Sequence, residues 1–91
     1  MKGTVIKTDK APAPGGWYSQ AYRAGNLIFT AGVTAADPIT QELTAPGDIV
    51  AQTHQTLKNL ESLLKACGSD LSHVIKTLVF VSDIDQFDQF N

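Results

Sequence analysis

The sequence holds one cysteine, one arginine and one tryptophan among its 91 residues. Because Cys67 has no second cysteine to pair with, a disulfide within the chain is excluded, and the sequence predicts a protein of the reducing cytoplasm. Bidentate capture of a carboxylate or phosphate is mainly the work of arginine, so Arg23 is the only candidate for such a clamp.

Long apolar runs and an excess of positive charge are also missing. No run approaches the roughly 20 residues that span a bilayer, and the N-terminus lacks the apolar core of a signal peptide. The formal net charge of -2 provides no basic field that would attract nucleic acid. The sequence therefore predicts a single domain, residues 1–91, with no membrane partner and no nucleic-acid partner.

The motifs that bind common cofactors and metals are not found. The sequence has no phosphate loop, no Gly-x-Gly-x-x-Gly, no paired histidines at ligand spacing and no Gly-x-Ser-x-Gly elbow. His54 and His73 are scattered, and ordinary surface or helix-end positions explain them better than metal binding. Cys67 is predicted to be a core cysteine rather than a nucleophile, since no base is placed beside it. We expect no cofactor and no metal.

Residues that favour strands and turns dominate the first half of the chain. Residues 3–8 are β-prone, and the prolines that follow end this strand. Residues 21–24 and 27–31 flank Gly25-Asn26, a pair that tolerates positive φ and favours a two-residue hairpin. Residues 37–42 have the chemistry of a turn. The sequence predicts a strand, a loop, a hairpin and a second loop.

The second half begins with a helical period. Asp48 is a predicted N-cap and Gly68 a predicted end, and between them one apolar stripe recurs at three and four residues. This stripe consists of Val50, Thr53, Leu57, Leu60, Leu64 and Cys67. Residues 74–81 are nearly all apolar and β-branched, which predicts a buried central strand. Ser82 or Asp83 begins a second helix with Ile84, Phe87 and Phe90 on one face.

Tyr18 stands after two glycines, where the chain enters the hairpin. A tyrosine there offers both an aromatic face and a hydroxyl. It is either a packing residue or part of a binding site, and the spacing alone favours packing.

Several short segments occur together in an order that is typical of one family. They are Tyr18-Ser19-Gln20-Ala21, Ala24-Gly25-Asn26-Leu27, Phe29-Thr30-Ala31-Gly32, Asp37-Pro38, Gln52 with the helix around residues 57–64, and the run from Val74 to Phe80. By these segments the chain resembles the reactive-intermediate deaminase family, also called the YjgF family, over essentially its whole length.

The resemblance implies a fold, an assembly and an activity. The fold is α+β and chorismate-mutase-like, a mixed sheet backed by two helices, of which this chain holds the N-terminal portion and ends within the second helix. The assembly is a homotrimer with clefts between subunits. The activity is hydrolysis of reactive 2-enamine and 2-imine acids, such as 2-aminoacrylate, to 2-keto acids and ammonia without a cofactor. The small-molecule partner is then an imine or a keto acid.

The resemblance also implies substrate-binding residues. These are Tyr18, Ala31, Gly32 and Asn91, with Ala31 in a position where the family often has serine. The arginine and glutamate of the family lie in a segment that follows Asn91, so no catalytic residue is assigned within this chain.

Three departures from the family pattern affect the expected cleft. Val33 stands where glutamine is frequent and makes the wall more apolar. Trp17 replaces a proline and is expected to add a rigid apolar flank. Gln41 replaces a glycine, so we expect the turn after Pro38 to differ in conformation.

Three functions are compatible with the residues to different degrees. The first is imine or enamine deamination. The second is non-catalytic small-molecule binding or protein interaction on the same fold, favoured by the apolar Ala31 and Val33. The third, a ribonuclease or translation-inhibiting activity attached to some relatives, is disfavoured by the negative charge and the lack of a basic patch.

Overall fold

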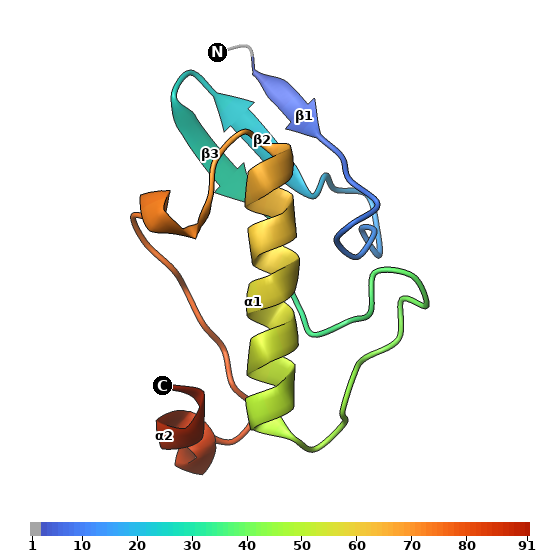
Figure 1. The fold of residues 1–91 in the computed structure, drawn as a ribbon, viewed down its shortest axis with the longest axis vertical. Coiled ribbons are helices and arrows are strands. Elements are labelled where there is room, and N and C mark those ends of the chain that lie inside the picture. The colour runs from blue at the N-terminus through green and yellow to red at the C-terminus, as the bar shows by residue number, and fades with distance from the viewer. Residues whose placement is uncertain (1–2) are drawn as a thin grey trace.

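The structure is a computed structural model that describes residues 3–91. Three strands form an antiparallel sheet in the order β1-β2-β3, and one long helix, α1, lies across it (Figure 1). The strands are β1 (Thr4–Ile6), β2 (Ala21–Ala24) and β3 (Leu27–Thr30). A short helix, α2 (Phe87–Phe90), lies at the C-terminal end. The α+β class expected from the sequence is confirmed.

The hairpin forms where the sequence predicts it. Ala24 pairs with Leu27 across the turn, and Gly25 adopts the positive φ of 61° that such a two-residue turn requires. Strand β1 pairs with β2 but ends earlier than expected, at Ile6. The reason is that the backbone N–H of Thr8 donates to the Gln20 side chain, not to a neighbouring strand.

Helix α1 (Ile49–Ala66) also has the predicted limits. The Asp48 carboxylate accepts a hydrogen bond from the N–H of Ala51 at 3.1 Å, which satisfies one of the free donors of the first turn. At the other end Gly68 takes a φ of 81° and reverses the chain. The hydrophobic core forms here, from Ala11, Ala21, Leu63 and Cys67.

The apolar stripe predicted for α1 is partly wrong. Leu64 and Cys67 are buried, but Val50 and Leu57 are exposed. The face that packs is centred on residues one position away, Asn59 and Leu63, both of which are fully buried. Only the C-terminal part of α1 lies over the sheet, and its N-terminal end extends past it (Figure 1), so the apolar residues of the first turns have no strand to cover.

The central strand predicted for residues 74–81 is wrong for the structure described. A 3₁₀ turn, η1 (Leu71–His73), follows α1, and residues 74–81 then run without regular structure toward α2 (Figure 1). Ile75 and Phe80 are 86% and 87% exposed. β propensity describes how a residue fits a sheet and does not supply the strand that pairs with it. Without this strand the described sheet is entirely antiparallel, not mixed.

The second helix begins close to the predicted position. Asp83 caps a 3₁₀ turn, η2 (Ile84–Gln86), by accepting from the N–H of Asp85 at 3.0 Å, and η2 continues into α2. The rings of Phe87 and Phe90 lie 6.3 Å apart, which confirms that they share a face. No helix among residues 3–91 is long and apolar enough to cross a membrane.

Candidate functional site

A small cavity lies between the two ends of the hairpin and the loop that precedes it. Its volume is about 70 Å³, and we call it the Tyr18 cavity. Three of the four residues that the resemblance implied for substrate binding line it, namely Tyr18, Ala31 and Gly32. The remaining lining residues are Ala11, Pro12, Ala13, Pro14, Gln20, Val33, Thr34 and Leu63. Residues that are far apart in the sequence therefore meet at one site.

Tyr18 is held by its own loop. Its hydroxyl oxygen accepts a hydrogen bond from the N–H of Gly15 at 3.1 Å, and its backbone N–H donates to the carbonyl of Gly16 at 2.9 Å. A hydroxyl that accepts one bond still carries its own proton as a donor. Tyr18 can therefore offer an O–H to a ligand while the Gly15 N–H fixes the position of its oxygen.

Gln20 forms one wall of the cavity and was not recognised from the sequence. Its side chain is buried, its Oε1 accepts from the N–H of Thr8 at 2.8 Å, and its Nε2 donates to the carbonyls of Thr8, Ala11 and Pro12 at 3.0, 3.3 and 2.8 Å. These bonds fasten the loop after β1 to the start of β2. The signal available in the sequence was a polar side chain directly before a strand.

Asn59 supports the opposite wall and was also missed. It is 1% exposed, and its Nδ2 donates to the carbonyls of Thr34 and Ala36 at 2.9 and 2.8 Å, while its Oδ1 accepts from Gln55 at 2.9 Å. The segment that carries Gly32 is thus tied to α1 by a buried amide. An asparagine four positions before Leu63 on a packing face was the signal in the sequence.

The cavity wall is largely apolar and carries no carboxylate, ammonium or guanidinium group. Val33 lines it, as the resemblance led us to expect. The backbone N–H groups of Gly32 and Val33 have no acceptor among the described residues. A Cβ added to Gly32 would meet no atom of the described chain within 4 Å. The site therefore offers a tyrosine hydroxyl within a largely apolar surface.

Asn91 does not join these residues. It follows α2, whose residues contact α1, and the C-terminus lies by the end of α1 that extends past the sheet (Figure 1). It is not part of the cavity lining. Of the four implied binding residues, the structure brings together three.

Arg23 belongs to β2, and its guanidinium group lies near Gly68, just after the C-terminal end of α1. Arg23 does not line the cavity. A Cβ on Gly68 would be 3.7 Å from its guanidinium nitrogen Nη2. A cation there complements the partial negative charge of the helix end. Burial raises the pKa of the neighbouring Cys67 thiol, and the Arg23 charge opposes this rise. Cys67 is buried in the core, as predicted.

Two clusters of polar side chains outside the cavity stabilise turns by hydrogen bonds. Ser72 and His73 both bond the same oxygen of Asp70, the histidine at 3.1 Å, and these bonds, that of Ser72 first, hold the pKa of Asp70 below its usual value. Because the Ser72 hydroxyl is bonded to the carboxylate in this exposed cap, the three residues do not form a charge-relay triad.

The second turn borders an open depression of about 480 Å³. The N–H groups of Thr40 and then Ile39 bond the Asp37 carboxylate and lower its pKa. Gln41 takes a positive φ of 65°, the left-handed conformation that favours glycine. Its side chain bonds Ala13 and Pro38, which offsets the strain.

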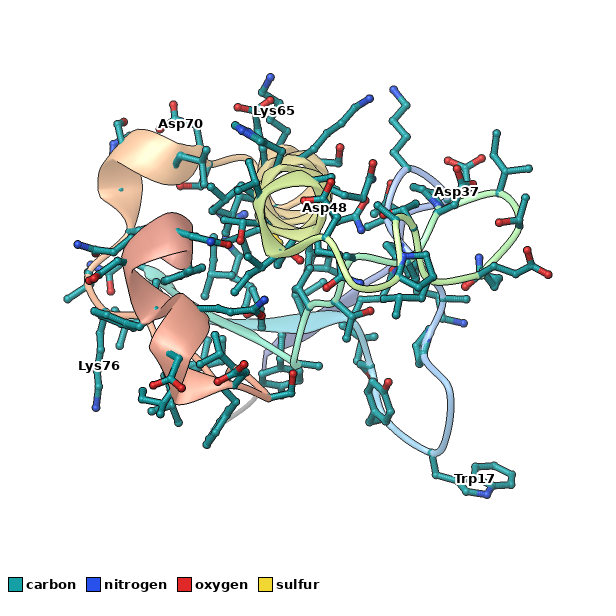
Figure 2. All side chains as sticks on the ribbon, turned by 90° about the horizontal axis from the view of Figure 1, so that it is seen from below. Trp17, Asp37, Asp48, Lys65, Asp70 and Lys76 are labelled. Atoms are coloured by element: carbon teal, nitrogen blue, oxygen red, sulfur yellow. The ribbon has the colours of Figure 1, made fainter. Side chains whose placement is uncertain are left out.

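Trp17 does not flank the cavity as expected. It is 107% exposed, and its indole ring projects away from the body of the molecule (Figure 2). Trp17 stands next to Tyr18 in the sequence, but the sequence did not predict the direction of its side chain.

Comparisons with known proteins agree on one family. The family model described as Endoribonuclease L-PSP matches residues 8–91. The chain is 46% identical over 87 residues to a RutC family protein of Pyrococcus horikoshii, covering 96% of this chain and 68% of that protein. It is 42% identical over 87 residues to the 2-iminobutanoate/2-iminopropanoate deaminase of Mus musculus, covering 96% of this chain and 64% of that one.

A solved structure gives the same result for the fold. The crystal structure of RidA from the Antarctic bacterium Psychrobacter sp. superimposes with a TM-score of 0.90 at 37% identity, covering 96% of this chain and 69% of that one. The chain thus spans about two thirds of the length of these proteins.

Proposed function

The chain belongs to the endoribonuclease L-PSP family, and from this we propose that it takes part in the hydrolytic deamination of reactive 2-enamine and 2-imine acids to 2-keto acids and ammonia. The observation that carries the proposal is the Tyr18 cavity, which gathers Tyr18, Ala31 and Gly32. The name of the mouse relative supports the substrate class.

The residues that line the cavity suggest which group would carry out each part of the reaction. Hydrolysis adds water to the imine carbon, breaks the carbon–nitrogen bond and releases ammonia, leaving a carbonyl. The free N–H groups of Gly32 and Val33 would orient the substrate, since backbone donors that need no reorganisation stabilise negative charge well. The Tyr18 O–H, 3.1 Å from the fixed Gly15 N–H, would donate to the substrate nitrogen.

A second candidate is a non-catalytic small-molecule-binding or interaction protein on the same fold. It is favoured by the lining, which has no charged side chain and has apolar Ala31 and Val33. Binding without hydrolysis needs only the shape of the cavity and its few donors.

The first test compares Tyr18→Phe with the native chain. A serine dehydratase generates 2-aminoacrylate, and the release of 2-keto acid is followed with and without the protein. Because the resemblance places the family's arginine and glutamate after Asn91, we expect only a slow acceleration of release by the chain, and we expect Tyr18→Phe to reduce this acceleration about 2- to 10-fold, the value of one hydrogen bond. Tyr22→Phe is the matched control, because Tyr22 lies on β2 and does not line the cavity.

The outcome separates the two candidates. No acceleration by a native chain that still binds 2-oxobutanoate would favour the binding protein. No acceleration and no binding of 2-oxobutanoate would refute the proposed deaminase.

We also propose that the chain self-associates, as a homotrimer in the cytoplasm. Its solvent-accessible area is 6846 Å². A compact monomer of 9.8 kDa is expected to expose about 5,200 Å². The difference between these two areas is comparable with the area buried in specific interfaces. Apolar residues on the strands, such as Leu27 and Phe29, are among those exposed.

Light scattering at micromolar concentration tests the assembly. We expect the mass of three copies of the 9.8 kDa chain. Replacing Phe29 by Glu is expected to lower the mass, because a charge would then need to be buried at the contact. A native chain that scatters as a monomer would contradict the proposal.

A further inference from the structure

The carboxamide of Gln20 is a buried polar group whose donor hydrogens are both in use. The residue is 6% exposed, and its Nε2 bonds the carbonyl oxygens of Thr8, Ala11 and Pro12 at 3.0, 3.3 and 2.8 Å. An amide nitrogen carries two hydrogens, so three carbonyl acceptors leave none for a ligand. Gln20 lines the cavity without offering it a donor, and its effect on a ligand must act through the residues that it holds.

Gln20 joins two sides of the Tyr18 cavity. Its side chain bonds Ala11 and Pro12 in the loop after β1. Its backbone carbonyl oxygen accepts from the N–H of Ala31, just after β3, at 2.9 Å. Ala11, Pro12 and Ala31 all line the cavity. One residue therefore fixes the loop after β1 relative to the segment that contains Ala31 and Gly32.

Tyr18 lies inside the segment that the Gln20 side chain closes. This segment runs from Pro12, whose carbonyl oxygen accepts from Nε2, to Gln20 itself. Within it the Tyr18 hydroxyl accepts from the Gly15 N–H at 3.1 Å. Among the described residues, residues 15–19 form hydrogen bonds only with one another. The ends of the segment therefore decide where the Tyr18 hydroxyl lies.

A second side chain holds the same segment, but from the surface. The Gln41 Oε1 accepts from the N–H of Ala13 at 3.0 Å, in an exposed position where water can take its place. A buried group that loses its partner costs more free energy than one that water can satisfy. Gln20 is therefore the stronger of the two anchors.

We infer that Gln20 is a positioning residue of the candidate site: its carboxamide holds the Tyr18 hydroxyl and the Ala31–Gly32 segment at the spacing that the ligand requires. The inference rests on the proposed function for the class of ligand, a small keto or imino acid. A cavity of about 70 Å³ leaves little space for adjustment. A displacement of about 1 Å can slow a reaction between positioned groups about 100-fold.

Calorimetry with 2-oxobutanoate gives the first test. Gln20→Met keeps the length of the side chain but removes the amide, so the carbonyls of Ala11 and Pro12 lose their donor. We expect binding to weaken about 10-fold, measured well below the midpoint of unfolding. Gln20→Asn keeps the amide but is one methylene too short, and we expect it to weaken binding in the same direction. It decides the question if Gln20→Met does not fold.

Fluorine NMR observes Tyr18 itself, with no ligand needed. The chain has two tyrosines, so a Tyr22→Phe chain that contains fluorinated tyrosine gives one resonance, from Tyr18. We expect this resonance to move when Gln20→Met is added, because the hydroxyl leaves its place in the cavity wall.

Leu64→Ala separates positioning from stability. Leu64 is buried on α1 but does not line the cavity. Its truncation is expected to lower the midpoint of unfolding at least as far as Gln20→Met does. We expect the Tyr18 resonance and the binding of 2-oxobutanoate to stay as in the native chain.

Three results would overturn the inference or its premise. If Gln20→Met is less stable but keeps the native affinity and the native Tyr18 resonance, Gln20 serves the fold alone. If Leu64→Ala weakens binding as much as Gln20→Met does, the loss reflects stability and not position. If the native chain does not bind 2-oxobutanoate, the proposed function fails, and an unmoved Tyr18 resonance in Gln20→Met then refutes the positioning role separately.

Discussion

Asn59→Leu is expected to lower the free energy of unfolding by about 2 to 4 kcal/mol, because a leucine fills the space but leaves buried polar groups unpaired. The carbonyls of Thr34 and Ala36 lose their donor, and Gln55 loses its acceptor. A chain of this size has a total stability on the order of 5 to 14 kcal/mol, so the loss is a large part of it.

Urea unfolding measures this effect. His54→Leu provides the matched control on the same helix, because His54 is exposed and the same polar-to-leucine change leaves no carbonyl without a donor. We expect its unfolding midpoint to stay near that of the native chain. A midpoint for Asn59→Leu equal to that of the control would show that the buried amide does not hold the cavity wall to α1.

Gly32→Val is expected to weaken the binding of 2-oxobutanoate about 10- to 100-fold, the cost of forcing extra atoms into a filled site. Gly32 lines a cavity of only about 70 Å³, and an added Cβ meets no described atom within 4 Å. The valine side chain therefore has room in the fold, and we expect it to occupy space that the ligand needs. Stability is expected to change little.

Calorimetric titration and thermal unfolding together check this expectation. Thr30→Val is the control, since it adds apolar surface on β3 beside the cavity without lining it. If Gly32→Val binds the keto acid as tightly as the native chain does, the ligand site is not this cavity.

The elements that the sequence predicted correctly are those whose signals are local. The Gly25-Asn26 turn, the Asp48 cap and the Gly68 end each act within a few residues, and the hairpin and α1 follow from them. The strand expected at residues 74–81 depended on a partner strand, and a run of β-branched residues does not contain that information.

The residues of the candidate site also differ in whether they could be predicted from the sequence. Tyr18, Ala31 and Gly32 were implied by a resemblance that spans the chain, and they meet in one cavity. Gln20 and Asn59 could not be found by pattern, because a buried polar side chain is stable only when its partners surround it, and those partners are loop carbonyls fixed by the tertiary fold.

The central claim is that the Tyr18 cavity is the site of a small keto or imino acid. The most direct measurement is the change in backbone amide NMR shifts when the native chain is titrated with 2-oxobutanoate. The account predicts that the shifts concentrate at Tyr18, Gly32 and Val33, which line the cavity. Shifts confined to the open depression around Asp37 and Lys58, or no shifts at saturating ligand, would contradict it.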